Sequence, residues 1–193
     1  MSKVIVRVGA VLALLAAAGP LAAQQDLSCP FRGSNPGDRL SPLDSVMFQI
    51  DGHAVKVCYG RPSLRGRTMI GGDAAPFGRV WRTGANETTK IRTTVALDIG
   101  GIEVEPGTYA IYTVPGETEW EFELNRAWEQ WGRENSYTDE VRAQAVDRIT
   151  LPRETPADTI ETFTIRTEPA SEGVRLILEW QDHRVTVPIR ARG

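Results

Sequence analysis

Residues 45–59 read SVMFQIDGHAVKVCY, and this stretch indicates an antiparallel β-sheet. Asp51-Gly52 separates two β-prone runs and is a strong hairpin signal, because both central residues of a tight turn must tolerate positive φ. Val55 and Val57 stand two residues apart in the second run, which places both side chains on one face of a strand. The stretch therefore predicts a β-hairpin with one apolar face.

The same pattern recurs downstream, where short β-prone runs are separated by Gly-Gly, Pro-Gly and Gln-Asp turns. In one of these runs Trp120, Phe122 and Leu124 alternate with glutamates, which is typical of a strand with one buried and one solvated face. The predicted strands are 45–50, 53–59, 88–99, 102–105, 108–114, 119–124, 160–167, 174–180 and 184–190. About nine short strands predict an all-β protein, a single antiparallel β-sandwich of jelly-roll-like or related type.

Two segments deviate from this pattern and are expected to add one or two short helical turns. Trp128 and Trp131 lie three residues apart within 125–135, a spacing that suits one or two turns of helix. The segment 137–151 fits a helix and a strand equally well, because its apolar residues match both periods. We favour a short strand late in this segment.

The N-terminus has the pattern of a secretory signal peptide. Lys3 and Arg7 precede an apolar run over 8–23, and small residues lead to cleavage after Ala23. This run has 16 residues, fewer than the about 20 that a membrane span needs; an uncleaved anchor is the alternative. We therefore expect a signal peptide over 1–23, an irregular N-terminal arm over 24–44 and a sandwich domain over 45–193. The mature protein, without a membrane span, is expected in the periplasm or outside the cell.

Charge and cysteine content narrow the possible partners. The chain has 22 basic and 25 acidic residues, a net charge of −3, and loss of two basic residues with 1–23 brings this to −5. An acidic protein of this kind is not expected to bind nucleic acid, which requires a basic footprint. Cys29 and Cys58 both lie in the mature part. Export permits a disulfide between them, and two separate thiols are the alternative.

Residues 60–86 read GRPSLRGRTMIGGDAAPFGRVWRTGAN and interrupt the strand pattern. Long connections of this kind are often functional in compact domains. The segment holds five arginines and a single acid, Asp73. Guanidinium groups suit carboxylate or phosphate, and Trp81 adds an aromatic surface between Arg79 and Arg82. The loop is therefore the candidate binding region, although arginines in a long loop also serve as internal braces.

Several motifs resemble the bacterial family catalogued as domain of unknown function 2911. They are 59–67 (YGRPSLRGR), 78–87 (GRVWRTGANE), 106–109 (PGTY), 111–116 (IYTVPG), Glu119-Trp120 and the segment from Asn125 to Trp131-Gly132. The resemblance covers roughly residues 40–190 and implies an exported, all-β protein. The family has no established activity, so the resemblance assigns no catalytic residue. The pair of cysteines departs from the family's general pattern.

We interpret the protein as a binding module for a small anionic or carbohydrate ligand. The predicted ligand-binding residues are Arg61, Arg65, Arg67, Arg79, Trp81, Arg82, Asn86 and Glu87. One alternative is a hydrolase of an exported substrate, with Glu87 or Asp73 as acid or base. The other is a structural or protein-interaction domain, in which the loop is a brace or a partner surface and holds no small ligand.

Recognisable catalytic motifs are missing from the sequence. Ser63 lacks the G-x-S-x-G context of a nucleophile elbow, and no P-loop, dinucleotide fingerprint or zinc spacing occurs. No cofactor or metal is therefore expected, and whether the protein is an enzyme stays open. His53 and His183 each flank a hairpin turn without a partner at ligand spacing, so we expect both to be solvated turn residues.

Overall fold

The computed structural model describes residues 27–29, 36–132 and 134–192. The predicted signal peptide and its cleavage site lie outside the described residues. In the described part of the chain, no helix has the length and apolar character needed to cross a membrane.

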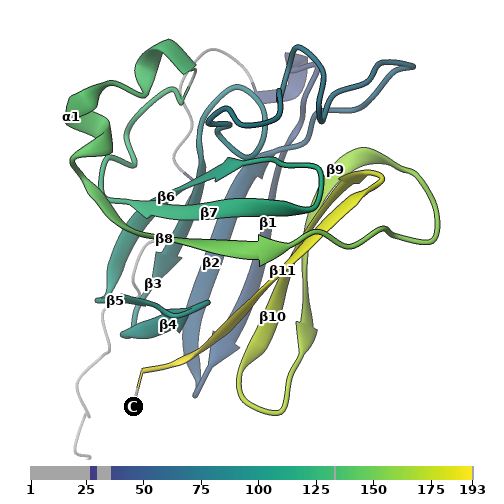
Figure 1. The fold of residues 1–193 in the computed structure, drawn as a ribbon. Coiled ribbons are helices and arrows are strands. Elements are labelled where there is room, and N and C mark those ends of the chain that lie inside the picture. The colour runs from purple at the N-terminus through teal and green to yellow at the C-terminus, as the bar shows by residue number, and fades with distance from the viewer. Residues whose placement is uncertain (1–26, 30–35, 133, 193) are drawn as a thin grey trace, which may run out of the picture.

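The protein is an all-β sandwich of two antiparallel sheets (Figure 1). One sheet has six strands in the order β1-β2-β3-β6-β7-β8, and the other has five in the order β5-β4-β11-β10-β9. The strands are β1 (Leu43–Ile50), β2 (His53–Gly60), β3 (Thr89–Thr93), β4 (Leu97–Ile99), β5 (Ile102–Val104), β6 (Gly107–Val114), β7 (Glu119–Asn125), β8 (Ala145–Pro152), β9 (Ile160–Pro169), β10 (Val174–Gln181) and β11 (His183–Ala191). The predicted fold class is confirmed.

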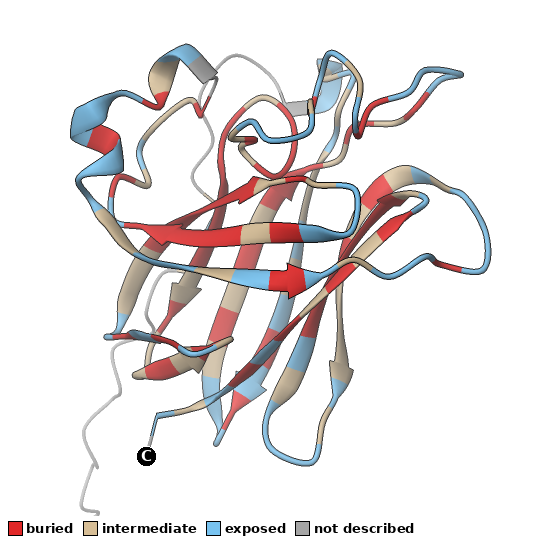
Figure 2. Cartoon of the chain, viewed as in Figure 1, coloured by how far each residue is buried: buried red, intermediate tan, exposed pale blue. Residues whose placement is uncertain are grey.

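The core lies between the sheets because alternate residues of each strand face inward. Buried and more exposed residues alternate along several strands in Figure 2. Val55 and Val57 of β2 are fully buried, as are Phe122 of β7 and Val185 of β11. The hairpin predicted from Asp51-Gly52 is also confirmed: these residues have φ of 50° and 79°, and Ile50 pairs with His53.

The predicted strand 88–99 is in fact two strands that belong to different sheets. β3 pairs within the six-stranded sheet, whereas β4 pairs with β5 and β11 in the other. The Thr93 hydroxyl donates to the Val95 carbonyl at 2.6 Å and accepts from the Val95 amide at 3.1 Å. Such local side-chain bonds compete with a strand ladder, so the chain leaves one sheet here and enters the other. With β8, this division gives eleven strands in the described residues instead of about nine.

The segment after β7 also differs from the expectation. Residues 126–132 form non-helical turns, in which the Asn125 side-chain oxygen accepts from the Ala127 amide at 2.8 Å, a bond that stabilises a turn. Short helical turns follow at η2 (Glu134–Ser136) and α1 (Asp139–Arg142). The strand favoured late in 137–151 is present as β8.

The N-terminal arm is attached to the six-stranded sheet. Cys29 and Cys58 form a disulfide, with their Cα atoms 5.6 Å apart. A short turn, η1 (Pro36–Asp38), precedes β1. The disulfide is compatible with an exported protein, because such bonds persist in oxidising compartments.

Candidate functional site

The 60–86 loop is anchored at several points. Single β-bridges connect Ser63 with Thr162 and Trp81 with Thr113. Leu64, Met69, Ile70 and Ala75 are buried in the core. Figure 1 shows this loop at the same end of the sandwich as α1, away from the C-terminus. The loop is therefore a packed part of the domain that holds its polar side chains in defined positions.

Most of the predicted arginines bind groups of the protein itself, and Arg82 donates from Nε to the Gly84 carbonyl at 3.4 Å. Arg61 lies 3.2 Å from Asp44 and donates to the Phe163 carbonyl and the Thr164 hydroxyl. Arg65 donates to the Leu40 carbonyl at 2.6 Å, and Arg67 donates to the carbonyls of Ser63 and Leu64. These contacts brace the loop against the arm, against β9 and against itself.

Trp81 belongs to the aromatic core. Its side chain stacks on Trp180 with ring centroids 5.6 Å apart, and it meets Trp120 and Phe163 edge to face. Only 6% of the residue is exposed, and aromatic clusters of this geometry add to the energy of burial. Trp81 therefore positions the chain around Arg82, and little of its ring is available to a ligand.

Glu87 is buried beside Arg39. Both of its carboxylate oxygens accept hydrogen bonds from the Arg39 guanidinium, at 2.6 and 2.7 Å. The hydrogen bond to Glu87 raises the pKa of Arg39 above its usual value. Sequence reasoning missed Arg39, because the two residues are 48 positions apart and nothing in the arm's composition marks their contact.

A hollow of about 290 Å³ lies beside Trp81. Asp73 and Arg82 are the two charged residues among the described residues that line it. We call it the Arg82 hollow; its lining residues are Asp73, Ala74, Pro76, Val80, Trp81, Arg82 and Gly132. Asp73 is exposed, and its carboxylate accepts no hydrogen bond from any described residue. Arg79 and Asn86, also predicted, do not line this hollow.

Gly132 closes the Arg82 hollow from the segment after β7. A Cβ atom at this position would lie 1.9 Å from the Thr88 hydroxyl oxygen and 2.8 Å from the Arg82 Cβ. With φ at +79°, the backbone is also in a region that favours glycine. Glycine thus allows the 126–132 turns to pack directly on Arg82, which brings the motif around Arg82 and the motif ending in Trp131-Gly132 into contact.

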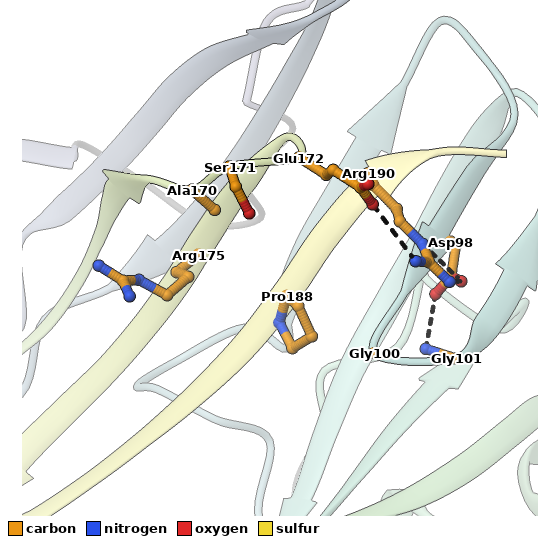
Figure 3. A pocket seen from close by; sticks show the side chains of 9 residues that line it. All are labelled: Asp98, Gly100, Gly101, Ala170, Ser171, Glu172, Arg175, Pro188 and Arg190. Carbon is orange, nitrogen blue, oxygen red and sulfur yellow. Dashed lines mark hydrogen bonds and ion pairs between the residues drawn. The ribbon is translucent and has the colours of Figure 1, made fainter.

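A second hollow, of about 520 Å³, lies on the outer side of the five-stranded sheet (Figure 3). Its charged residues already have partners: Arg190 lies 2.7 Å from Asp98 and 3.7 Å from Glu172, and Asp98 also accepts from the Gly101 amide. Arg175 pairs with Glu168, which lies outside the hollow. Exposed pairs of this kind contribute little free energy. The hollow offers few unused polar groups to a ligand, and despite its larger volume we regard it as the weaker candidate.

The two histidines differ from each other. His53 is exposed, as expected, whereas His183 is buried, and its Nδ1 accepts a hydrogen bond from the Trp120 indole. The expectation of a solvated His183 is therefore wrong. Burial lowers the pKa of His183 below its usual value, which favours the neutral form that this hydrogen bond requires. Among the described residues, no group of three or more His, Cys, Asp or Glu is placed to hold a metal ion.

Comparison with protein families gives one match. The sequence model described as "Protein of unknown function (DUF2911)" matches residues 41–189. Neither the comparison with curated proteins nor the comparison with solved structures finds a match. The match spans both sheets and the 60–86 loop.

Proposed function

The chain belongs to this family of proteins of unknown function, DUF2911, and we propose that it is a binding module for a small hydroxyl-rich ligand. The proposed site is the Arg82 hollow, and a single sugar ring is the proposed ligand class. The hollow's volume of about 290 Å³ lies just below the ~300–1,000 Å³ range of small-molecule sites. That size favours a ligand of one ring over a larger one.

The observation that supports this proposal is the pairing of Asp73 with Arg82 in one hollow. Asp73 supplies acceptors that no described residue uses, and a guanidinium supplies donors. Sugar hydroxyls both donate and accept, so one ring can contact both side chains. A purely anionic ligand would be repelled by Asp73, which is why a neutral sugar is preferred over a phosphate or a sugar acid.

The arginines outside the hollow support binding indirectly. Arg61 and Arg67 hold the loop through bonds to protein groups, so the loop is ordered before a ligand arrives. A site organised in advance loses less conformational entropy on binding. In this proposal Arg61, Arg65, Arg67 and Glu87 are framework residues, and Asp73 and Arg82 contact the ligand.

Hydrolase activity draws less support from the same hollow. Glycoside hydrolysis ordinarily uses two carboxyl groups that flank the scissile bond, and Asp73 is the one acid among the described residues that line the hollow. Glu87 does not line this hollow, and its carboxylate is bound by Arg39. A structural domain without a ligand is the stronger alternative, because Arg61, Arg65, Arg67 and Arg82 all bind groups of the protein itself.

A thermal-shift screen of the protein against neutral monosaccharides, sugar acids and inorganic phosphate tests the proposal. Ligands that bind only the folded state raise the melting temperature by mass action. We expect a shift with one or more neutral monosaccharides that is lost in Arg82→Ala and in Asp73→Asn. Arg67→Ala is the matched control, because it removes a loop arginine outside the hollow and should keep the shift.

Two results contradict the proposal. If no monosaccharide raises the melting temperature of the wild type, the binding module is not supported. If Arg82→Ala lowers the melting temperature without any ligand, by several degrees more than Arg67→Ala does, then Arg82 is a brace. That pair of results favours the structural domain.

A further inference from the structure

A second group of cations lies on the outer face of the six-stranded sheet. Lys56 of β2 pairs directly with Arg92 of β3, and Arg92 pairs with Thr108 of β6. Their neighbours Val57 and Ile91 are fully buried in the core. Because successive residues of a strand point to opposite faces, the row Lys56-Arg92-Thr108 points away from the core.

Two cations directly opposite each other destabilise a sheet unless an anion compensates them. Within the described residues, the side chains of Lys56 and Arg92 form no hydrogen bond or ion pair. Other strand arginines of this protein do have acidic partners: Arg148 pairs with Glu121 and Glu123, Arg166 with Glu179, and Arg190 with Asp98. The Lys56–Arg92 pair therefore differs from the charge pattern of the rest of the sandwich.

A small pocket of about 40 Å³ opens above this row, and we call it the Lys56 pocket. Its lining includes three cations, two hydroxyls and one indole ring, and the lining residues are Leu27, Ser28, Lys56, Cys58, Lys90, Arg92, Thr108 and Trp128. A water-sized group needs about 10–15 Å³ of such volume, so the pocket has room for about three oxygen atoms. The residues that line the pocket and the volume of the pocket both match a group with three terminal oxygens.

The walls of the Lys56 pocket are held in place on two sides. The Cys29–Cys58 disulfide ties the arm to β2 and so brings the neighbouring Ser28 to the pocket. On the other side, the Lys90 ammonium lies 5.6 Å from the centre of the Trp128 ring, within the range of a cation–π interaction. Lys90 is buried as well, so its charge lies in a partly desolvated setting, where electrostatic attraction is stronger than in water.

We propose that the Lys56 pocket binds a phosphate or sulfate group. Such a group carries three terminal oxygens and up to two negative charges when esterified, which fits the volume and the two facing cations Lys56 and Arg92. The anion relieves the repulsion between Lys56 and Arg92, and the hydroxyl of Thr108 donates to one of its oxygens. The group is either a free inorganic ion or the end of a monoester, since the chemistry of recognition is the same.

Isothermal titration calorimetry of the protein with inorganic phosphate, in low-salt buffer, tests this site, because salt screens partly exposed charges. We expect saturable binding that inorganic sulfate competes away. Arg92→Gln and Lys56→Gln should each weaken it by at least about tenfold, as loss of a charge-assisted hydrogen bond does. Arg175→Gln removes an exposed strand arginine paired with Glu168 on the other sheet and should leave the affinity unchanged.

Titration with a sugar phosphate monoester distinguishes the two sources of the anion. Tighter binding of the monoester assigns the pocket to a group on a larger molecule, and binding of inorganic phosphate alone assigns it to the free ion; both support the site. The proposed site is wrong if the wild type shows no saturable binding. It is also wrong if Arg175→Gln weakens phosphate binding as much as Lys56→Gln and Arg92→Gln do. Thermal melts check that each variant folds. If one of Lys56→Gln and Arg92→Gln does not fold, the other still gives the comparison with Arg175→Gln.

The Lys56 pocket and the Arg82 hollow share no lining residue. Arg82→Ala should therefore leave phosphate binding unchanged. If Arg82→Ala abolishes phosphate binding while Arg92→Gln does not, the anion binds at the Arg82 hollow and the assignment to the Lys56 pocket is wrong.

Discussion

Arg39 and Glu87 form a two-pronged ion pair in which both side chains are buried, with 8% and 7% of their surfaces exposed. The two N–O distances are 2.6 and 2.7 Å. Arg39 lies in the N-terminal arm, and Glu87 follows the 60–86 loop. The pair thus connects the arm to the end of the loop that carries Arg82.

Replacement of Arg39 by methionine should lower the free energy of unfolding by about 3–5 kcal/mol, because the Glu87 carboxylate stays buried without the guanidinium. Urea denaturation measures the change. The double variant Arg39→Met/Glu87→Gln should be more stable than Arg39→Met alone, since it removes the buried charge as well. A loss below about 1 kcal/mol in the single variant, the range of exposed pairs, would show that the pair is not buried in solution.

Removal of the disulfide through Cys29→Ser/Cys58→Ser should cost about 3–4 kcal/mol of unfolding free energy, the chain-entropy value for a loop of this length. The sequence separation of the two cysteines is 29 residues. Denaturant titrations of the wild type and the double variant give the difference. Mass spectrometry of the protein without reductant should also show the loss of two hydrogens, and two free thiols would contradict the bond.

Replacement of Gly132 by alanine should destabilise the protein and weaken sugar binding, because the new Cβ meets Thr88 at 1.9 Å beside Arg82. Gly52 is a matched control, since it has the same φ of +79° and no atom within 4 Å of the added Cβ. Both variants share the cost of positive φ, about 1–2 kcal/mol. The clash should add about 1–3 kcal/mol to Gly132→Ala. Equal losses in the two variants would show that the 126–132 turns do not pack on Arg82.

Tyr137 should make stability fall at high pH. Its hydroxyl donates to Glu123 at 2.6 Å, and burial together with this hydrogen bond raises the pKa of Tyr137 from 10.0 to about 12. The unfolded chain therefore loses this proton first, so stability is full below pH 10 and is lost as the pH rises towards 12. The full loss is roughly 3 kcal/mol.

The Tyr137→Phe variant isolates this contribution. Its stability is lower at neutral pH but should depend less on pH above about pH 9. Tyr59, whose pKa burial also raises, titrates in both proteins and cancels in the difference. The same slope in the two proteins would contradict the raised pKa of Tyr137.

The strands were predictable because their signals are local. Alternation around Trp120 and the Asp51-Gly52 turn depend on neighbours in sequence, and both are confirmed. The burial of His183 was also predictable. A two-residue turn at Gln181-Asp182 pairs His183 with Trp180, so its position on the sheet follows from the register.

The site was less predictable because its contacts are long-range. Trp81 lies in a loop without periodicity, so its burial against Trp180 depends on how the two sheets meet. The contact between Arg39 and Glu87 likewise depends on where the arm crosses the sheet. Asp73 was singled out as the loop's one acid, yet nothing local places it near Arg82.

The most direct test of the proposed function is a ¹⁵N NMR titration of the protein with the neutral monosaccharide that gives the largest thermal shift. Binding at the Arg82 hollow predicts saturable chemical-shift changes at the amides of Asp73, Arg82 and Gly132, with the amides around Arg190 unchanged. Changes centred on the second hollow, beside Arg190, would contradict the proposal that the Arg82 hollow binds the sugar. So would the absence of saturable changes at Asp73 and Arg82.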